Sequence, residues 1–346
     1  MTRRFWVFIE QEEGQVHPVA WELLGVARRL ASEVKDELEK SGDTAVVEGI
    51  LVGHEIEGLA QEVIRHGADC VYVVDALPFK HFLNKPYTSA LVSLVKKHKP
   101  EVFLIGATTL GRDLAGSVAT SLRTGLTADC TQLAMGEARD SGKKLLLATR
   151  PAFGGNVIAT IICKNHQPQM ATVRPRVFNV LPSDPKAKGE VVHEEIILTD
   201  ETVHAQIVEF INNATSSVKL EYSDVIVSGG RGLGNAKGFE LLKELADELG
   251  GVIGSSRGCV DSGWISYEHQ VGQTGKTVRP KLYIAAGISG AIQHKVGMQD
   301  SDFILAINRD PHAPIFEIAT LGIVGDLYEV IPAMIKQIRA TKEAQQ

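Results

Sequence analysis

The sequence is poor in the residues that several classes of function require. Only four cysteines occur in 346 residues, at positions 70, 130, 163 and 259, and no two of them form a CxxC pair. This scatter argues against an iron–sulfur cluster and against a thiol redox pair. The eleven histidines show no HExxH or comparable spacing, so we expect no metal site.

Charge of one sign and long hydrophobic runs are also scarce. The net charge is −6 and no basic block occurs, so we expect no nucleic-acid partner. No apolar run approaches the roughly 20 residues needed to cross a bilayer. The first apolar stretch, 5–9, stops at Glu10, which is too early for a signal peptide and typical of a strand. We therefore expect a cytoplasmic protein without a membrane span.

The first half of the chain alternates apolar strands with amphipathic helices. The pattern predicts strands at 5–9, 46–52, 70–74 and 102–105, and helices at 20–38, 57–65, 89–98 and 114–122. Repeated βα units of this kind predict a parallel sheet covered on both faces. From residue 144 the pattern becomes β-rich, with a hairpin-like connection at 150–156 and a further apolar run at 170–173.

A second βα series begins near Tyr222, so the chain is predicted to contain two domains. We expect an N-terminal parallel-sheet α/β domain with a β-rich extension at 1–206, and a C-terminal doubly wound α/β domain at 207–346. In the second, the pattern predicts strands at 224–228, 282–286 and 303–307, and helices at 239–249 and 327–338. A linker near 205–220 would let this domain swivel.

Glycine is concentrated in the second domain, where residues 229–297 hold 15 of the 33 glycines. This density predicts a close approach of the backbone to a bound ligand. After the strand at 282–286 the chain passes through Gly287-Ile288-Ser289-Gly290 into a segment that carries Gln293 and His294. Such a strand-to-helix turn predicts an anion site, although an ordinary βαβ unit would also explain it.

Three short motifs fail on their spacing or context. The turn at 229–234 lacks the third glycine of GxGxxG, because position 235 is Asn. Gly275-Lys276-Thr277 lacks the first glycine of a P-loop, because position 270 is Gln. Gly254-Ser255-Ser256-Arg257-Gly258 satisfies GxSxG, but a nucleophile elbow needs a strand before it and a helix after it. A serine hydrolase using Ser256 and His312 stays as an alternative.

The polar side chains that remain suit a ligand that brings its own chemistry. They are cations, amides and hydroxyls on loops, without a carboxylate pair or an activated nucleophile. A flavin dinucleotide meets that description, because it has two phosphates, a ribose and a ring with several hydrogen-bonding edges.

The stretch 282–308 resembles the signature of the electron transfer flavoprotein α subunit. The matching residues are Tyr283, Gly287, Ser289, Gly290, Ile292, Gln293, His294, Gly297, Ala306, Ile307 and Asn308. The likeness continues through GGRG at 229–232, Ser256-Arg257 with Val260-Asp261, QVGQTGK at 270–276, and 310–326. It therefore covers nearly all of the second domain.

The resemblance implies that the second domain binds one FAD. Arg257 would lie over the isoalloxazine ring, Thr274 near N5 and His294 by the C2 carbonyl, and these three would tune a flavin that is itself the redox centre. A cationic Arg257 and a protonatable His294 would favour flavin states that carry negative charge. The implied cofactor-binding residues are Arg231, Gly232, Ser256, Arg257, Gln270, Val271, Gly272, Gln273, Thr274, Gly287, Ser289, Gly290, Ala291, Ile292, Gln293, His294, Asn308, Asp326 and Leu327.

The resemblance also implies partners. The N-terminal domain would pack on an electron transfer flavoprotein β subunit that holds AMP or a second FAD. The heterodimer would be an electron carrier rather than a stand-alone enzyme, serving an acyl-CoA dehydrogenase or a similar flavoenzyme, with ferredoxin or flavodoxin as further candidates.

The first domain resembles family members from anaerobes at 106–132 and 150–156. Some of these members bifurcate electrons from NADH, so a simple carrier and a bifurcating oxidoreductase both stay open. A nucleotide-binding subunit without redox work is a further alternative.

Overall fold

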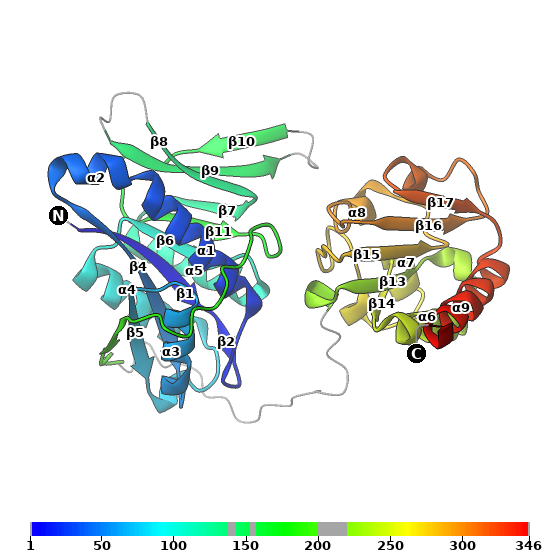
Figure 1. Cartoon of the computed structure of the whole chain (residues 1–346), viewed down its shortest axis with the longest axis horizontal. Helices are drawn as coiled ribbons and strands as arrows, with labels where there is room; N and C mark the ends of the chain where they lie inside the picture. The colour runs from blue at the N-terminus through cyan, green and yellow to red at the C-terminus, as the bar shows by residue number, and fades with distance from the viewer. Residues whose placement is uncertain (1, 138–142, 153–156, 199–219, 345–346) are drawn as a thin grey trace. The chain divides into compact units, whose positions relative to one another are not determined.

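The structure is a computed structural model that describes residues 2–137, 143–152, 157–198 and 220–344. The chain divides into two compact units, Met1–Phe210 and Ile211–Gln346, which are coloured from blue to green and from green to red in Figure 1. The predicted boundary at residue 206 and nearly all of the predicted linker at 205–220 lie outside the described residues. Each unit is considered by itself.

The first unit is built on a seven-stranded sheet in which every neighbouring pair is parallel. The strand order is β12-β5-β4-β1-β6-β11-β7. The bounds are β1 (Thr2–Ile9), β4 (Thr44–Gly53), β5 (Cys70–Asp75), β6 (Val102–Gly106), β7 (Leu126–Cys130), β11 (Gln169–Val173) and β12 (Glu190–His193). A small ribbon of β2 (Gln11–Glu12) and β3 (Gln15–Val16) follows β1.

Helices cover both faces of this sheet, as predicted from the repeated βα units. One hydrophobic core lies under α1, α2 and α3, and a second lies under α4 and α5. The bounds are α1 (Pro18–Glu33), α2 (Lys35–Ser41), α3 (Glu57–Arg65), α4 (Asn84–His98) and α5 (Thr109–Leu122). The helix predicted at 20–38 is therefore two helices that meet at Val34. The periodicity hides the break because Leu30, Val34 and Leu38 all remain buried.

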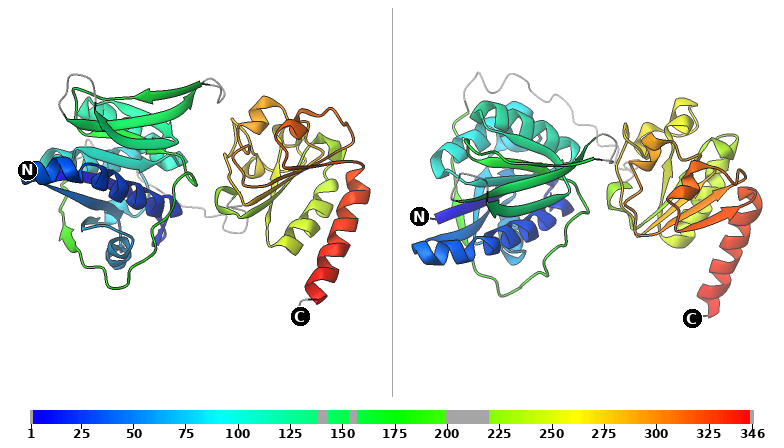
Figure 2. Two further views of the ribbon diagram at one scale, coloured as in Figure 1. Left: turned by 45° about the horizontal axis from the view of Figure 1, so that its top comes forward. Right: turned by 90° about the horizontal axis from the view of Figure 1, so that it is seen from above.

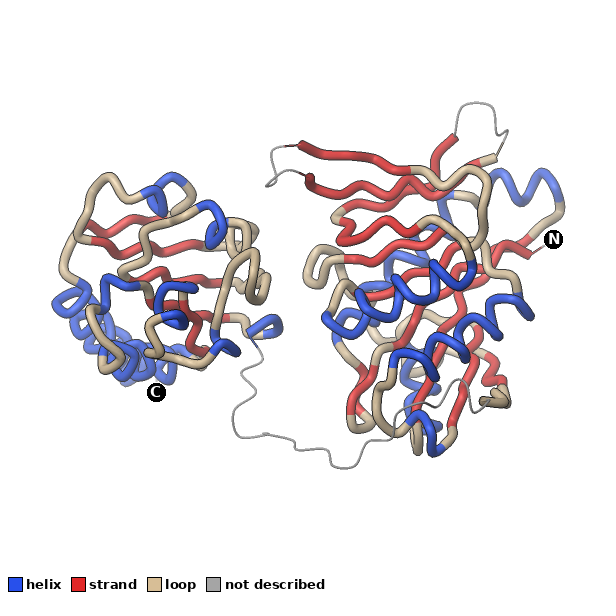
Figure 3. Tube along the Cα trace, turned by 180° about the vertical axis from the view of Figure 1, so that it is seen from behind, coloured by secondary structure: helices blue, strands red, loops and turns tan. Residues whose placement is uncertain are grey.

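The β-rich extension is a separate antiparallel sheet with the order β10-β9-β8 (Figure 3). Its strands are β8 (Gln132–Glu137), β9 (Lys144–Ala152) and β10 (Val157–Ile161). The predicted strand at 170–173 does not continue this sheet. It is β11, which inserts between β6 and β7 in the parallel sheet, where all five of its residues are buried. The predicted connection at 150–156 lies partly outside the described residues.

The second unit has a five-stranded parallel sheet with the order β14-β13-β15-β16-β17. The bounds are β13 (Val225–Gly229), β14 (Val252–Ser255), β15 (Leu282–Ala286), β16 (Ile304–Asn308) and β17 (Leu321–Val324). Numbered along the unit, this order is 2-1-3-4-5, so the winding direction reverses between β13 and β15. In open α/β sheets, ligands bind outside the carboxyl ends of the strands at such a switch point.

The two faces of this second sheet are covered differently (Figure 2). The long helices α6 (Gly238–Leu249) and α9 (Leu327–Ala344) pack over one core. The other core is closed by loops and short helical turns, among them α8 (Ile292–Lys295). The predicted segment around Gln293 and His294 is thus a single helical turn. None of the helices in the described ranges has the length and hydrophobicity that crossing a bilayer requires.

Candidate flavin site

The loops that follow β13 and β15 touch each other at the switch point. Gly230 N donates to the Ala286 carbonyl at 2.9 Å, and Gly232 N donates to the Gly287 carbonyl at 3.0 Å. A Cβ on Gly230 would lie 2.3 Å from the Gly287 oxygen, so no larger residue is accommodated there without moving backbone. The close contacts that these glycines make here are with the protein's own backbone, and their approach to a ligand stays a prediction.

The loop after β15 exposes a row of peptide N–H groups. Ile315 N donates to the Ser289 carbonyl at 3.1 Å, which fixes the loop from the far side. In the described part of the chain, no acceptor takes the N–H groups of Ser289, Gly290 and Ala291. Successive free N–H groups in a turn form an anion-binding concavity. The anion site predicted from the sequence therefore rests on this loop, since the four residues of α8 make too short a helix for a substantial dipole.

Two exposed guanidinium groups are carried on the loops that follow β13 and β14. Arg257 opens the short helix α7 (Arg257–Asp261), is exposed, and lies 3.3 Å from the Asp261 carboxylate. Arg231 is also exposed, and its stem passes so close to Gly258 that a Cβ there would lie 3.0 Å from Arg231 Cδ. The corner between β13 and β14 is tied by Ser256 N, which donates to the Gly229 carbonyl at 2.9 Å. Both cations are thus carried on adjacent loops at one edge of the sheet.

The loop at 270–276 is anchored to both neighbours. Val271 N donates to the Ser255 carbonyl at 2.9 Å, and Gln273 N donates to the Gln293 carbonyl at 2.7 Å. The side-chain amide of Gln270 is buried and donates to Thr274 Oγ1 at 3.1 Å. Gln273 and Thr274 themselves are exposed. The hydrogen bonds bring this loop against α8 and so next to His294.

His294 is buried, and Tyr283 Oη lies 3.0 Å from its Nε2. Burial lowers the pKa of His294 to about 4, opposed only in part by the Val271 backbone. At neutral pH the imidazole is therefore uncharged, and the role predicted for a protonatable His294 has to be carried by a neutral hydrogen-bond donor. The reason is desolvation, which disfavours the charged form of a buried histidine.

Asn308, Asp326 and Leu327 have structural roles, of which the sequence indicated only that of Asp326 as a cap of the final helix. Asn308 Nδ2 donates to the Ile288 carbonyl at 2.9 Å, and its Oδ1 accepts from Asp310 N at 3.0 Å. Asp326 accepts from Tyr328 N at 2.9 Å at the start of α9, and this bond, together with the Arg309 guanidinium, lowers the pKa of the Asp326 carboxyl. Leu327 is buried in the core under α9, so its predicted contact with the cofactor would involve backbone.

The structure brings most of the predicted residues to the carboxyl edge of one sheet. Those with exposed groups at this edge are Arg231, Gly232, Arg257, Gln273, Thr274, Ser289, Ala291, Ile292 and Gln293, and the buried ones are Gln270, Val271, Gly272, Gly290, His294 and Leu327. Sequence reasoning missed the hydroxyl of Tyr283 as a partner of His294. Tyr283 stands at an apolar position of a buried strand, and only its hydroxyl group could have indicated a role in the site.

The serine of the GxSxG sequence lacks an activating base. Ser256 Oγ lies 3.6 Å from Cys259 Sγ, and among the described residues no histidine hydrogen-bonds to this hydroxyl. The strand β14 does precede it, but α7, which follows, has five residues. The geometry therefore offers no activated nucleophile for the serine hydrolase alternative.

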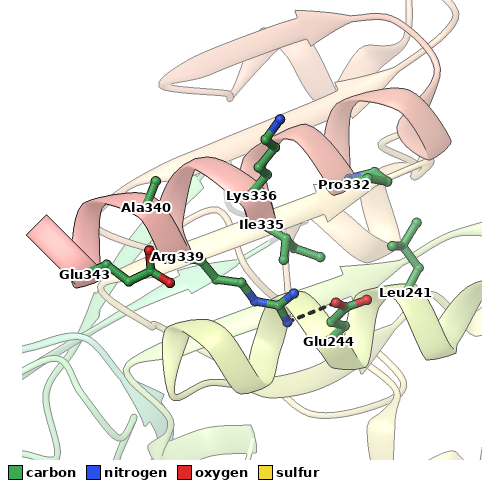
Figure 4. Close-up of a pocket in the computed structure, with 8 residues that line it drawn as sticks. All are labelled: Leu241, Glu244, Pro332, Ile335, Lys336, Arg339, Ala340 and Glu343. Atoms are coloured by element: carbon green, nitrogen blue, oxygen red, sulfur yellow. Dashed lines mark hydrogen bonds and ion pairs between the residues drawn. The ribbon is translucent and has the colours of Figure 1, made fainter.

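A groove in the second unit lies apart from this edge. This groove, between α6 and α9, is lined by Leu241, Pro332 and Ile335 together with the ion pair of Arg339 and Glu244 at 3.0 Å (Figure 4). None of the predicted cofactor-binding residues lines it. In the part of the chain that the structure describes, no three His, Cys, Asp or Glu side chains gather in a way that would hold a metal ion.

Comparison with known families agrees with the site. A model described as an electron transfer flavoprotein domain matches residues 5–197, and one described as an electron transfer flavoprotein FAD-binding domain matches residues 219–299. The chain therefore belongs to the electron transfer flavoprotein family. Within that family it matches the α subunits, so it is a flavin-dependent electron transfer protein, and the family predicted from its sequence is confirmed.

Individual relatives are similar over almost the whole chain. An electron transfer flavoprotein subunit alpha of Thermoanaerobacterium thermosaccharolyticum is 50% identical over 337 residues, which cover 97% of this chain and 98% of that protein. The subunit of the same name from Megasphaera elsdenii is 49% identical over 339 residues, covering 97% and 96%. Protein FixB of Azorhizobium caulinodans is 48% identical over 342 residues, covering 98% and 89%.

Proposed function

We propose that the second unit binds one FAD along the carboxyl ends of β13, β14, β15 and β16, and that the chain works as the α subunit of a heterodimeric electron carrier. The observation that carries this proposal is the row of unpartnered N–H groups at Ser289, Gly290 and Ala291 beside two exposed guanidinium groups, Arg231 and Arg257. An anionic ligand with a large polar remainder would occupy such an edge.

Each end of the cofactor has matching groups in this chain. The N–H groups of Ser289 and its neighbours, together with Arg231, would hold the diphosphate. The loop 270–274, Arg257 and His294 would line the ring, and Asn308 with Asp326 would support the adenosine end. The bound flavin supplies the one- and two-electron chemistry. The chain's own residues orient it and set its charge environment, so none of them is assigned a catalytic role.

The first unit is proposed to pack on a β subunit through its antiparallel sheet. β10 is an edge strand, and it exposes Val157, Ile158 and Ile161 to 49%, 70% and 43%. An exposed apolar edge strand is a template for pairing or packing with another chain. The exposed row on β10 therefore supports an interface there. AMP or a second FAD is the ligand proposed for the β subunit.

The electron donor or acceptor is proposed to be a flavoprotein dehydrogenase of the acyl-CoA dehydrogenase type, with ferredoxin or flavodoxin as further candidate carriers. Thr274, Gln273 and Ile292 are exposed beside the groups assigned to the ring. This exposure would leave one edge of the ring site accessible to a docked carrier.

Cofactor retention tests the site directly. The co-purified heterodimer should be yellow, with one FAD attributable to this chain. Asn308→Ala removes the hydrogen bond that holds the loop 288–291 at Ile288 and the bond that Asn308 accepts from Asp310 N, so FAD affinity should fall by about 1–2 kcal/mol, or roughly 5–30-fold. The measurement is the visible spectrum and flavin content after dilution and filtration.

The matched control is Asn235→Ala, which removes a similar local acceptor for Lys237 N at 2.9 Å and should retain FAD. A wild-type complex that holds no flavin even after reconstitution would sink the proposal. Equal retention by both variants would remove the role assigned to Asn308.

Replacing a cation at the ring end should lower the flavin potential. Arg257→Gln removes one positive charge, which stabilises added electrons by about 1 kcal/mol or more even when partly screened by solvent. The midpoint potential, measured by equilibration with a reference dye, should therefore fall. Arg339→Gln on α9 removes the same charge from the same unit, away from this edge, and should leave the potential unchanged. Equal potentials for both variants would contradict the placement of Arg257.

Introducing a charge on β10 should weaken subunit association. Ile158→Asp places a carboxylate on the exposed apolar edge strand, so the dissociation constant of the heterodimer should rise by roughly tenfold or more. Leu77→Asp, at a residue that is 67% exposed elsewhere in the first unit, is the control and should have little effect. Analytical ultracentrifugation would measure both, and an unchanged constant for Ile158→Asp would move the interface to another surface.

The bifurcating subtype stays a prediction of the sequence. For a member of this subtype, we expect NADH to reduce ferredoxin under anaerobic conditions in a reaction that is coupled to the reduction of an enoyl-CoA acceptor. The assay compares ferredoxin reduction with and without the acceptor and its dehydrogenase. NADH oxidation without such coupling would leave the chain as a simple carrier.

A further inference from the structure

A buried pair of side chains lies directly beneath the candidate site. Tyr283 is the second residue of β15, fully buried, and its hydroxyl oxygen is 3.0 Å from Nε2 of His294 in α8. The ring centroids are 6.1 Å apart at an interplanar angle of 59°, so the two groups meet through the hydroxyl and do not stack. This hydrogen bond links the floor of the site to the residue assigned to the flavin ring.

The direction of this hydrogen bond is argued from the protonation states of Tyr283 and His294. Burial raises the pKa of the Tyr283 phenol far above its ordinary value, so the phenol keeps its proton. Burial also keeps His294 neutral. The phenol oxygen carries a hydrogen, and we assign it as the donor to a bare Nε2; the opposite bond, from Nε2–H to the phenol oxygen, would send the phenol hydrogen to the Ser228 hydroxyl. The single proton of the neutral imidazole is then on Nδ1, because the bond at one ring nitrogen fixes the state of the other.

The second nitrogen of the ring makes no hydrogen bond of normal geometry to the protein. Nδ1 of His294 is buried and has no such bond within the described residues, although the Val271 backbone lies near enough to raise the pKa of the ring. A buried donor without an acceptor is costly, and in native proteins it is normally satisfied by a partner outside the chain. Nδ1–H is therefore the group that His294 has available for a bound ligand.

We infer that Tyr283 is a positioning residue, whose hydroxyl holds His294 as a neutral imidazole that offers Nδ1–H to the cofactor. This inference rests on the proposed function for the identity of the acceptor, which would be a carbonyl of the flavin ring. The hydrogen bond itself is a property of this chain alone. Through it, β15 controls both the orientation and the protonation state of a side chain in the site.

Among the described residues, no charged side chain shifts the pKa of His294. Its ring meets the Tyr283 phenol from β15 and the Val271 backbone from the adjacent loop, and the buried Ser228 hydroxyl on β13 lies next to that phenol. The next residue, Lys295, pairs with Glu317 at 2.7 Å. Protonating Nε2 would force the phenol to turn its hydrogen away, with the Ser228 hydroxyl as the group to receive it. His294 should therefore not titrate near neutral pH.

The first arm of the test reads the tautomer directly. In the full heterodimer, labelled with ¹⁵N-histidine, the ring nitrogens of His294 should show a protonated Nδ1 and a bare, hydrogen-bonded Nε2 from about pH 6 to 8. The His294→Asn variant assigns the signal. An imidazolium, or a proton on Nε2, at pH 7 would overturn the inference. The ¹⁵N measurement does not require bound flavin. A colourless complex would therefore refute the proposed function, and the His294 tautomer could still be measured in it to test the inference.

The second arm tests whether Tyr283 acts through His294. Tyr283→Phe should shift the ¹⁵N signals of His294, and it should change the equilibrium constant for flavin reduction by about three- to tenfold. In a His294→Asn background the same substitution should have no effect on that constant, which is the non-additivity expected of coupled residues. Additive effects would assign Tyr283 a merely structural role.

The control for loss of a buried hydroxyl is Tyr87→Phe. Tyr87 is buried in the first unit and donates to the Phe79 carbonyl at 2.9 Å, so this variant tests general destabilisation without touching the site. It should leave the His294 signals and the flavin potential unchanged. Should Tyr283→Phe fail to fold, the tautomer of the wild-type complex alone decides the matter.

Discussion

The contact between the loops after β13 and β15 is the constraint on which the second unit depends. The sheet reverses its winding at this point, so the two loops leave in opposite directions from adjacent strands. Hydrogen bonds from Gly230 to Ala286 and from Gly232 to Gly287 draw the backbones together, and no side chain fits between them. In the loop after β15, the N–H groups of Ser289, Gly290 and Ala291 have no acceptor among the described residues. The edge that we propose for the phosphates therefore results from the topology, without a long helix or a fixed dinucleotide fingerprint.

Charge is distributed across the site according to the cost of desolvation. The two guanidinium groups, Arg231 and Arg257, stay at the exposed rim, where a cation remains hydrated. The buried position at the floor of the site is occupied by His294, which stays neutral. A cation at that depth would carry a penalty of several kcal/mol unless it were paired, and no charged partner contributes to the state of His294. The site can thus attract an anionic cofactor from outside while its interior stays uncharged.

The sequence predicted the elements well where one periodicity decided the matter. The strand at 282–286 and the helix at 57–65 are found with the predicted bounds. Prediction was weaker where tertiary contacts decide. The apolar run at 170–173 was predicted only as part of the β-rich stretch, without a place in either sheet, and its buried residues complete the parallel one. The break at Val34 was missed because the apolar stripe continues through it.

The same distinction applies to the site. Residue identity was enough to collect Arg231, Ser289 and His294 as candidates, since their chemistry is readable from the sequence. Their state was not readable, because it depends on depth. His294 was expected to be protonatable, and only its burial and its hydrogen bond to Tyr283 show a neutral ring. Asn308 was expected to meet the cofactor, while both ends of its amide are already bound to backbone.

Electron transfer places different demands on a site from those of bond-making catalysis. A carrier needs no residue that attacks or protonates a substrate. At the candidate edge, no histidine among the described residues hydrogen-bonds to the Ser256 hydroxyl, and burial keeps His294 neutral. A carrier needs a chromophore held rigidly and still within reach of a partner. The hydrogen bonds from Val271 and Gln273 hold the ring-side loop, while Thr274 and Ile292 remain exposed beside it, Ile292 to 66%. The same edge therefore combines a backbone held by hydrogen bonds with exposed side chains. This combination would keep the proposed cofactor site fixed and still accessible to an electron-transfer partner.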